Sequence, residues 1–274
     1  MATQAATLAR PTGQSSGGLL LPAFTLWWRE IVRFYRQTTR VIGVLASPLV
    51  FWLVLGSGFG TSFSSGGGSQ QHYLDYSYPG ILTLIVLFTS IFAMMSVIED
   101  RKEGFLLSVL VAPVPRAAIV LGKVLGGTTL AAMQGLIFLV FAPFAGIHLG
   151  LLQVLLVAVV VFLVAFALTA LGFAIAWPMD SSQAFHGIVN LFLIPLWLVS
   201  GALFPISGAS GWIRVVMRLN PLTYGVEALR ALLYPGIETA FPLSSDIATL
   251  VLFSLVMFAL AFLMANRRST KPAA

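Results

Sequence analysis

Residues 99–123 read EDRKEGFLLSVLVAPVPRAAIVLGK and begin with five consecutive charged side chains, in a chain where only 9% of residues are charged. A short apolar stretch follows, and then the sequence Pro113-Val114-Pro115-Arg116. The segments on either side are apolar enough to suit lipid. Because charges need a polar setting, we interpret this stretch as a docking element on the cytoplasmic face of a membrane protein.

The composition of the whole chain is that of an integral membrane protein. Hydrophobic residues make up 58% of 274 positions, and the mean hydropathy is +0.97. Soluble domains contain roughly 45–50% apolar residues. A spanning helix needs about 20 mainly apolar residues. Six such runs are predicted, and they leave no segment for a separate soluble domain: 41–59, 79–98, 119–145, 151–177, 184–204 and 246–265.

The distribution of basic residues predicts the orientation. With both termini in the cytoplasm, twelve of the fifteen Lys and Arg residues, Lys123 among them, fall on the cytoplasmic side, as the positive-inside rule requires. The three exceptions lie in the outer segment 205–244. The net charge of +6 is therefore interpreted as an orientation signal and not as a sign of nucleic-acid binding. The absence of cysteine excludes disulfides and thiolate metal sites.

Two segments precede the first predicted span. Residues 1–22 lack the apolar core of a signal peptide and are expected to form a disordered cytoplasmic leader. In 23–40, aromatic side chains and arginines recur on opposite helical faces, which predicts an interfacial amphipathic helix. Its tryptophans would lie at headgroup depth, and its arginines would meet anionic lipid or, alternatively, a partner protein. The residues in question are Trp27, Trp28, Arg29, Arg33 and Arg36.

The segment 205–244 is predicted to lie on the outer side. Asn220-Pro221 separates two short apolar helices, the second of which runs from Thr223 to Leu233. Because so many apolar residues cannot stay in water, we expect both helices to dip into the outer leaflet without crossing it. Glu227 and Arg230 are three residues apart and are predicted to pair on the second helix.

No catalytic or nucleotide-binding pattern is present in the sequence. The three histidines are scattered and have no partners at metal-ligand spacing. Gly122-Lys123 resembles the end of a phosphate loop, but Ala117 and Val124 violate the GxxxxGK[ST] pattern. The middles of the predicted spans also lack charged residues, which ion-coupled carriers usually keep. If the protein is a pump, its energy must therefore come from elsewhere.

Two motifs resemble those of the permease subunits of type-2 ATP-binding-cassette transporters, such as daunorubicin-exporter and nodulation-factor-exporter permeases. EDRKEGFLLSVLVAPVPRAAIVLGKVL at 99–125 is similar to the family's charged, leucine-rich segment that ends in Pro, a basic residue and Gly-Lys. The stretch at 220–230, NPLTYGVEALR, is similar to the family's segment before the last span. Phe105 and Leu107 depart from the family pattern and make the docking surface more apolar.

The resemblance implies an all-α, polytopic membrane protein with six transmembrane helices, an N-terminal interfacial helix and an outer re-entrant helical hairpin before the last span. Residues 23–274 would form a single domain. The subunit would pair with a second copy and bind two separately encoded ATPase subunits, which carry the ATP and Mg, so that this chain itself needs no cofactor.

The implied activity is export of an amphiphilic, lipid-linked or drug-like substrate across the bacterial inner membrane by alternating access. Two alternatives remain open at this point. One is a polysaccharide or teichoic-acid exporter. The other is an uncoupled channel, carrier or membrane scaffold.

The resemblance also assigns roles to particular residues. The coupling segment 99–118 would contact the ATPase through Glu99, Asp100, Arg101, Lys102, Glu103, Gly104, Pro113 and Arg116. The second and fifth spans would line the substrate path with Thr83, Leu87, Ser90, Met94, Asn190, Ile194 and Trp197. The outer gate at 205–244 would include Asn220, Pro221, Tyr224, Glu227 and Arg230.

Overall fold

The computed structural model describes residues 18–36, 46, 49–50, 52–54 and 73–266. The first predicted span, 41–59, lies mostly outside the described residues, and so does most of the predicted leader. The last residues of that leader are helical, because α1 begins at Leu20. The prediction of disorder up to residue 22 is therefore wrong for its last three residues.

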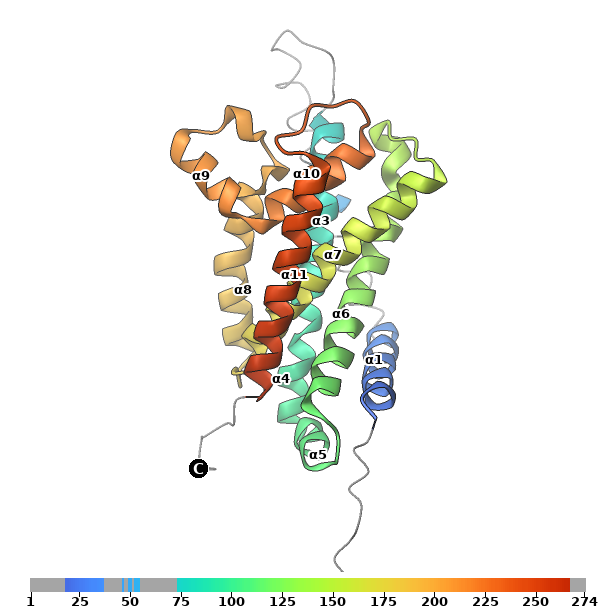
Figure 1. The fold of residues 1–274 in the computed structure, drawn as a ribbon, viewed down its shortest axis with the longest axis vertical. Coiled ribbons are helices and arrows are strands. Elements are labelled where there is room, and N and C mark those ends of the chain that lie inside the picture. The colour runs from blue at the N-terminus through green and yellow to red at the C-terminus, as the bar shows by residue number, and fades with distance from the viewer. Residues whose placement is uncertain (1–17, 37–45, 47–48, 51, 55–72, 267–274) are drawn as a thin grey trace, which may run out of the picture.

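The described part of the chain is built from helices joined by short turns (Figure 1). The elements are α1 (Leu20–Tyr35), α3 (Tyr73–Ala93), α4 (Met95–Lys102), α5 (Phe105–Val111), α6 (Arg116–Phe138), the 3-10 helix η2 (Leu139–Ala145), α7 (Leu151–Ala176), α8 (Ser182–Trp197), the π-helical turn η3 (Leu198–Ala202), the 3-10 turn η4 (Ile206–Gly208), α9 (Gly211–Leu219), α10 (Pro221–Leu233) and α11 (Leu243–Asn266).

Five helical stretches in the described residues are long and apolar enough to cross a membrane: Asp75–Lys102, Arg116–Ala145, Leu151–Ala176, Ser182–Ala202 and Leu243–Asn266. They match the second to sixth predicted spans. Several run a few residues beyond the apolar segments, because a helix continues through polar residues once it leaves the hydrocarbon region. The stretch Asp75–Lys102, which corresponds to the second predicted span, extends furthest. It carries the first four charges of the coupling segment.

The core of the bundle is formed by α3, α6 and α7, which pack against one another. α1 lies along α6, and α11 lies along α7 (Figure 1). α8 is buried along only one stripe, formed by Phe185, Val189, Leu193 and Trp197 at spacings of four. The other faces of α8 are exposed and mainly apolar, as expected for a helix that meets lipid or another subunit.

The two ends of the bundle differ in construction. One end, called here the α5 end, carries α4, α5 and the last residues of α11 (Figure 1). The opposite end, called the α9–α10 end, carries the two short helices. These helices confirm the predicted break at Asn220-Pro221: the Asn220 side chain accepts a hydrogen bond from Leu222 N (3.0 Å) and caps α10. Their depth in a membrane stays a prediction.

Candidate functional sites at the two ends of the bundle

At the α5 end, glycines of α6 allow α1 to lie directly on the α6 backbone. A Cβ atom at Gly122 would come within 2.6 Å of the Ala23 carbonyl oxygen, and one at Gly126 would come within 2.8 Å of Glu30 Cβ. Small residues permit close helix packing where lipid offers no hydrophobic driving force. The close contact brings the carboxylate of Glu30 to Lys123.

The ammonium group of Lys123 is buried between three helices, and its side chain is only 1% exposed. It donates to Glu30 Oε1 (2.7 Å) from α1, and to Ser96 Oγ (3.1 Å) and an Asp100 carboxylate oxygen from α4. From the sequence alone, Lys123 was predicted only to lie on the cytoplasmic side, and no role was predicted for Glu30. Two features of the sequence could have indicated this contact: Lys123 lies two turns inside an apolar helix, and Glu30 is an acidic residue among arginines.

Two arginines of α1 complete this arrangement. Arg29 donates from two nitrogens to the two carboxylate oxygens of Asp100 (2.9 and 2.8 Å). Arg33 donates to Asp100 Oδ1 (2.9 Å) and to Glu99 Oε2 (2.7 Å). Burial lowers the pKa of Arg29, but the hydrogen bonds and charge of Asp100 outweigh burial, so the pKa is raised and the guanidinium stays charged. We call these residues the ion cluster: Arg29, Glu30, Arg33, Glu99, Asp100 and Lys123.

The ion cluster changes the interpretation of the amphipathic helix. Arg29 and Arg33, which were predicted from the sequence to meet anionic lipid or a partner protein, are bound by acidic residues of the same chain. Arg36 and Trp28 are exposed, whereas Trp27 is half-buried and donates from Nε1 to Thr129 Oγ1 (3.0 Å). The aromatic side chains of α1 are divided between two faces: Phe34 is buried, whereas Phe24, Trp28 and Tyr35 are exposed, and the Tyr35 hydroxyl lies 3.7 Å from Met133 Sδ of α6. An interfacial position of the exposed aromatic side chains stays a prediction.

The next charges of the coupling segment also bind their own chain. Arg101 donates to the carbonyl oxygens of Trp177 and Met179 (2.8 Å to the latter) and pairs with Asp180 (3.0 Å). Lys102 Nζ lies 3.4 Å from Ser182 Oγ. α4 is thereby fastened to the turn between α7 and α8. The prediction that the whole charge cluster faces a partner is too broad for Asp100, which is fully buried.

A tight turn separates α4 from α5. Gly104 has φ +77°, a left-handed conformation that glycine adopts without strain, and α5 starts at the next residue. Glu103, before the turn, has a side chain that is 60% exposed. After α5, Pro113 is exposed, and Arg116 Nη1 donates to the Ala265 carbonyl oxygen (2.9 Å), which joins α6 to the end of α11.

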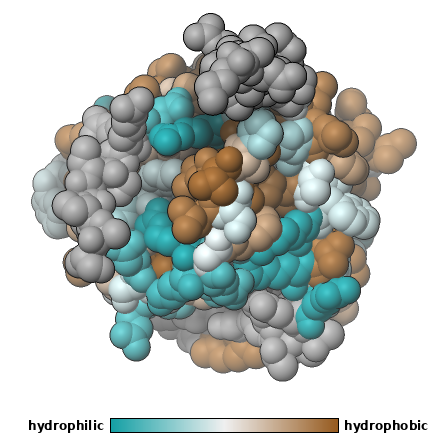
Figure 2. Space-filling model, turned by 90° about the horizontal axis from the view of Figure 1, so that it is seen from below, coloured by the Kyte–Doolittle hydropathy of each residue, from teal (hydrophilic) through white to brown (hydrophobic). Residues whose placement is uncertain are grey.

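α5 presents one apolar face inward and another outward. Leu106 is buried, and Phe105 lies under the Arg29 guanidinium, whose carbon is 3.7 Å from the ring centre. Phe105 therefore fastens α5 to α1. The outward face exposes apolar side chains, and Figure 2 shows apolar atoms bordered by hydrophilic ones at this end. We call the outward face the α5 patch: Leu107, Leu110 and Val111.

At the α9–α10 end, α8 loses its regular helical bonding in the π-helical turn η3, where Gly201 has φ +82°. Side chains from other helices satisfy the freed carbonyl oxygens. The Gly201 oxygen accepts from Arg230 Nη2 (2.9 Å) and from the Tyr76 hydroxyl (3.1 Å). The Leu196 oxygen accepts from Asn220 Nδ2 (2.6 Å). The end of α8 is thus tied to both α3 and α10.

The predicted pair on α10 is present. Arg230 Nη1 donates to Glu227 Oε1, and both residues are buried, with 6% and 3% of their surface exposed. The other Glu227 oxygen accepts from Ala240 N (2.9 Å). Tyr224, another residue of the predicted gate, donates from its hydroxyl to the Arg218 carbonyl oxygen (2.8 Å), while Pro221 is the first residue of α10.

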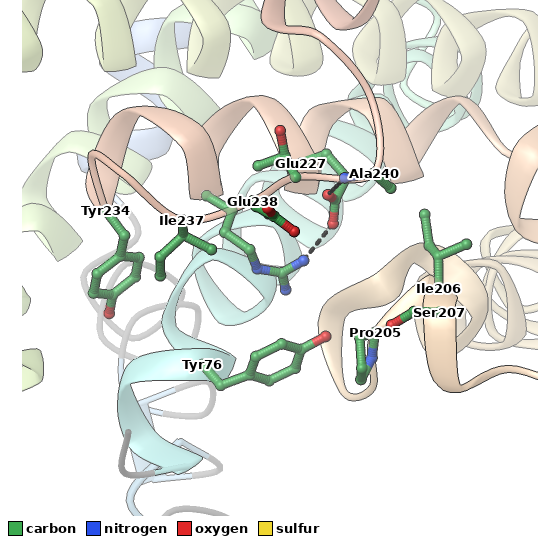
Figure 3. Close-up of a pocket in the computed structure, with 11 residues that line it drawn as sticks. Tyr76, Pro205, Ile206, Ser207, Glu227, Tyr234, Ile237, Glu238 and Ala240 are labelled. Atoms are coloured by element: carbon green, nitrogen blue, oxygen red, sulfur yellow. Dashed lines mark hydrogen bonds and ion pairs between the residues drawn. The ribbon is translucent and has the colours of Figure 1, made fainter. Parts of the chain in front are cut away.

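A cavity of about 310 Å³ lies beside this pair (Figure 3). Its wall includes Tyr76 of α3, Glu227 and Arg230 of α10, and Tyr234 and Glu238 of the following loop. Burial raises the pKa of Tyr234. The Tyr234 hydroxyl stays protonated and donates to the Asp75 carbonyl oxygen (2.7 Å).

The residues predicted to line a substrate path do not share one surface in the structure. Thr83, Leu87 and Ser90 of α3, and Met94 between α3 and α4, are fully buried inside the subunit. Trp197 is also buried and donates from Nε1 to the Gly80 carbonyl oxygen (2.8 Å).

Only the α8 pair, Asn190 and Ile194, is exposed. Phe88 and Phe92 of α3 are partly exposed and stack on each other, and Phe92 contacts His186 of α8. The substrate path stays a prediction, because apolar sequence alone does not show which side of a helix meets its own bundle.

Most of the chain matches one recognised sequence family. A family model described as ABC-2 type transporter matches residues 23–234, from α1 to the end of α10. The chain belongs to this family. As an ABC-2 permease it is a multi-pass membrane protein and a transport subunit, in a family whose members generally carry no ATPase site of their own and work with ATPase partners.

Curated relatives of this ABC-2 permease cover most of its length. It is 29% identical over 215 residues to a putative transport permease ycf38 of Cyanophora paradoxa, covering 76% of this chain and 73% of the relative. It is 25% identical to the daunorubicin resistance ABC transporter permease protein DrrB1 of Streptomyces coeruleorubidus, with coverage of 76% and 73%. It is 23% identical to nodulation protein J of Rhizobium leguminosarum bv. trifolii, with coverage of 89% and 92%.

Proposed function

We propose that this chain is the permease subunit of an ATP-driven exporter that moves an amphiphilic, lipid-linked or drug-like substrate across the bacterial inner membrane by alternating access. The observation that carries the proposal is the single helical stretch Asp75–Lys102. Near one end it holds Asp100, in the ion cluster, and at the other it holds Tyr76, which binds Gly201. At about 1.5 Å per residue it spans roughly 40 Å.

This stretch connects the two candidate sites mechanically. A force on the α5 patch reaches α4 through the Gly104 turn and reaches α1 through Phe105. The ion cluster holds α1, α4 and α6 together, so these helices move as a unit. Displacement of α3 then shifts the Tyr76 hydroxyl, which shares the Gly201 oxygen with Arg230 of α10. This shift would open the outer gate of the substrate path at the α9–α10 end.

The proposal includes the partners that the mechanism needs. Two separately encoded ATPase subunits would bind ATP and Mg and contact the α5 patch, since an apolar patch with a polar border is typical of a protein interface. A second copy of this chain would form the other half of the path, against the exposed faces of α8. A further span at 41–59 would complete six, with both termini in the cytoplasm. The drug-like cargo agrees with the name of the daunorubicin resistance relative.

The test uses the permease and the ATPase encoded beside it, co-purified and placed in lipid vesicles. ATP-dependent movement of daunorubicin is followed by its intrinsic fluorescence. Leu107→Ser removes an apolar side chain that is 67% exposed on the α5 patch, and it is expected to weaken ATPase association about tenfold and to reduce transport.

The matched control is Leu152→Ser, at a leucine that is 69% exposed at the start of α7, and it should change neither quantity. Unchanged association and transport in Leu107→Ser would refute the coupling role of α5. Ion currents from the permease alone, without an associated ATPase, would favour the uncoupled channel.

A further inference from the structure

We propose that the cavity at the α9–α10 end is a binding site for an organic ammonium that also carries hydroxyl or carbonyl oxygens. Its use for the polar head of the exported cargo rests on the proposed function, whereas binding itself does not require an ATPase. Three observations lead to this ligand chemistry: the size of the cavity, the balance of charge in its wall, and one buried donor without an acceptor.

The cavity has the size of a site for one small polar group. Its volume of about 310 Å³ is at the lower end of the range of small-molecule sites. The wall comes from α3, from α10 and from two loop segments, 205–207 and 237–240. Figure 3 shows the side chains of these elements arranged around the opening. Apolar atoms of Pro205, Ile206 and Ile237 alternate with hydroxyl groups and charged groups, so the site suits a polar molecule with a carbon frame.

The charges in the wall favour a cation. Among the described lining residues, Glu227, Glu238 and Arg230 are the charged ones, which gives a net charge of −1. Arg230 is neutralised by Glu227, so the excess charge belongs to Glu238, which is exposed and has no ion-pair partner among the described residues. A singly charged ammonium brings the wall to neutrality, whereas an anion would meet excess negative charge.

Neighbouring charges outside the cavity leave this balance unchanged. Arg214 touches the wall from behind, since its Nη2 lies 3.3 Å from the Ser207 carbonyl oxygen and 3.1 Å from that of Ala209. Asp246 is buried behind Glu227, and neither of its carboxylate oxygens has a hydrogen-bond partner among the described residues. Neither Arg214 nor Asp246 lines the cavity, so Glu238 still decides which ligand charge is preferred.

Arg230 explains why the ligand needs an oxygen acceptor. Its Nη1 donates to Glu227 and its Nη2 donates to the Gly201 oxygen, but its Nε is buried and has no acceptor. A buried donor without an acceptor is unfavourable, and a hydroxyl or carbonyl oxygen from a ligand would satisfy it. The guanidinium is held in place over the Tyr76 ring, 4.4 Å from its centre. The donor is thus pre-organised, which lowers the entropy lost on binding.

The experiment measures binding to the purified permease alone, in lipid nanodiscs, by saturation-transfer NMR titration. Glucosamine, glucose and glucuronate are the probes, because they share a ring and differ in charge. We expect glucosamine to bind about tenfold more tightly than glucose, and glucuronate to bind least. Cyclohexylamine, an ammonium without hydroxyl groups, should bind more weakly than glucosamine because it offers Arg230 Nε no acceptor.

Variants of the exposed Glu238 test the charge assignment without disturbing the buried pair. Glu238→Gln should lower glucosamine affinity about tenfold and abolish its advantage over glucose. Glu238→Lys should reverse the order, so that glucuronate binds best. The control Asp180→Asn changes an exposed carboxylate at the α5 end and should leave all affinities unchanged. Any one of three results would refute the proposed site. These are equal affinities for the three sugars, no binding of any of them, or an unchanged affinity for glucosamine in Glu238→Gln.

Transport measurements keep this proposal separate from the export function. Glucosamine binding in a permease that never moves daunorubicin with its ATPase would leave the site standing and refute the export function as proposed. ATP-dependent daunorubicin transport by a permease that binds none of the sugars would leave export standing and overturn the site.

Discussion

Buried ion pairs occur at both ends of the same long helical stretch, but they differ in how completely their polar atoms are satisfied. In the ion cluster, three cations and three carboxylates contact one another, and all of its buried side-chain nitrogens and oxygens have partners. At the α9–α10 end, Arg230 Nε, the Thr223 hydroxyl and both Asp246 carboxylate oxygens are buried without one.

This difference indicates different tasks for the two ends. A fully satisfied polar network is rigid, because any displacement leaves charges unpaired. A partly satisfied one beside a cavity can accept a ligand or rearrange at lower cost. We interpret the ion cluster as a rigid joint that transmits force. We interpret the Arg230 region as the responsive end, which rearranges when that force or a ligand reaches it.

Breaking the rigid joint should have the largest effect on stability. Lys123→Met leaves the carboxylates of Glu30 and Asp100 buried with one cation fewer, which costs about 3–5 kcal/mol. The free energy of unfolding, measured by SDS titration of the purified permease, should fall by this amount. The control is Lys102→Met, which alters an exposed lysine on the same surface and should stay within about 0.5 kcal/mol of the parent. A similar small loss for Lys123→Met would contradict the description of the cluster as rigid.

Removing the buried cation at the α9–α10 end should lower the free energy of unfolding by a smaller amount. Arg230→Met removes a donor from Glu227 Oε1 and one of two donors from the Gly201 oxygen, but Ala240 N still binds Glu227 Oε2, Tyr76 still binds the Gly201 oxygen, and the cavity admits water. We expect a loss of about 2–3 kcal/mol in the same titration. If Arg230→Met proves as destabilising as Lys123→Met, the contrast between the two ends is lost.

Sequence patterns predicted the charge-bearing segments but not the partners of those charges. The Glu227–Arg230 pair could be predicted because its members are three apart on one helix. The ion cluster could not, since it joins residues as much as 93 positions apart through the packing of α1 on α6. A lone Lys123 and a lone Glu30 do not specify each other until that packing is known.

A third change tests the packing that assembles the joint. Gly122→Ala places a methyl group within 2.6 Å of the Ala23 carbonyl oxygen, which is backbone and cannot move aside. α1 must shift outward, and the unfolding free energy should fall by about 1–2 kcal/mol. Gly187→Ala, on the exposed side of α8 with no atom within 4 Å, should instead be neutral or slightly stabilising. Equal effects at both glycines would show that the close contact is unimportant.

The smallest effect on stability is expected on the α5 patch. Val111→Ser changes a side chain that is 78% exposed and should alter the unfolding free energy by less than about 0.5 kcal/mol. Its effect should appear only in ATPase association, measured by co-purification. A large loss of stability would show that this side chain supports the fold and not a partner.

The faces of the helices were harder to predict than their existence. Five of the predicted spans are present with modest shifts of their ends, because 20-residue apolar runs are strong signals. The buried side of α3 could not be predicted in the same way: Thr83, Leu87 and Ser90 lie inside the bundle, and in an apolar helix both the lipid-facing and the core-facing sides are hydrophobic. A similar difficulty applies to α5, where Phe105 is covered and Leu107 is exposed. Only the position of α1 decides which of these two residues is covered.

The sequence separation within the ion cluster also sets the order of events during synthesis. Glu30 and Asp100 leave the ribosome 93 and 23 residues before Lys123. At about 5–20 residues per second, Glu30 waits roughly 5–19 s for its cation. Until then α1 has no α6 to lie on, so it must remain outside the bundle. Nascent chains that stop short of Lys123 lack the ammonium group that binds Glu30 and Asp100 in the folded chain, so the joint between α1, α4 and α6 cannot form in them.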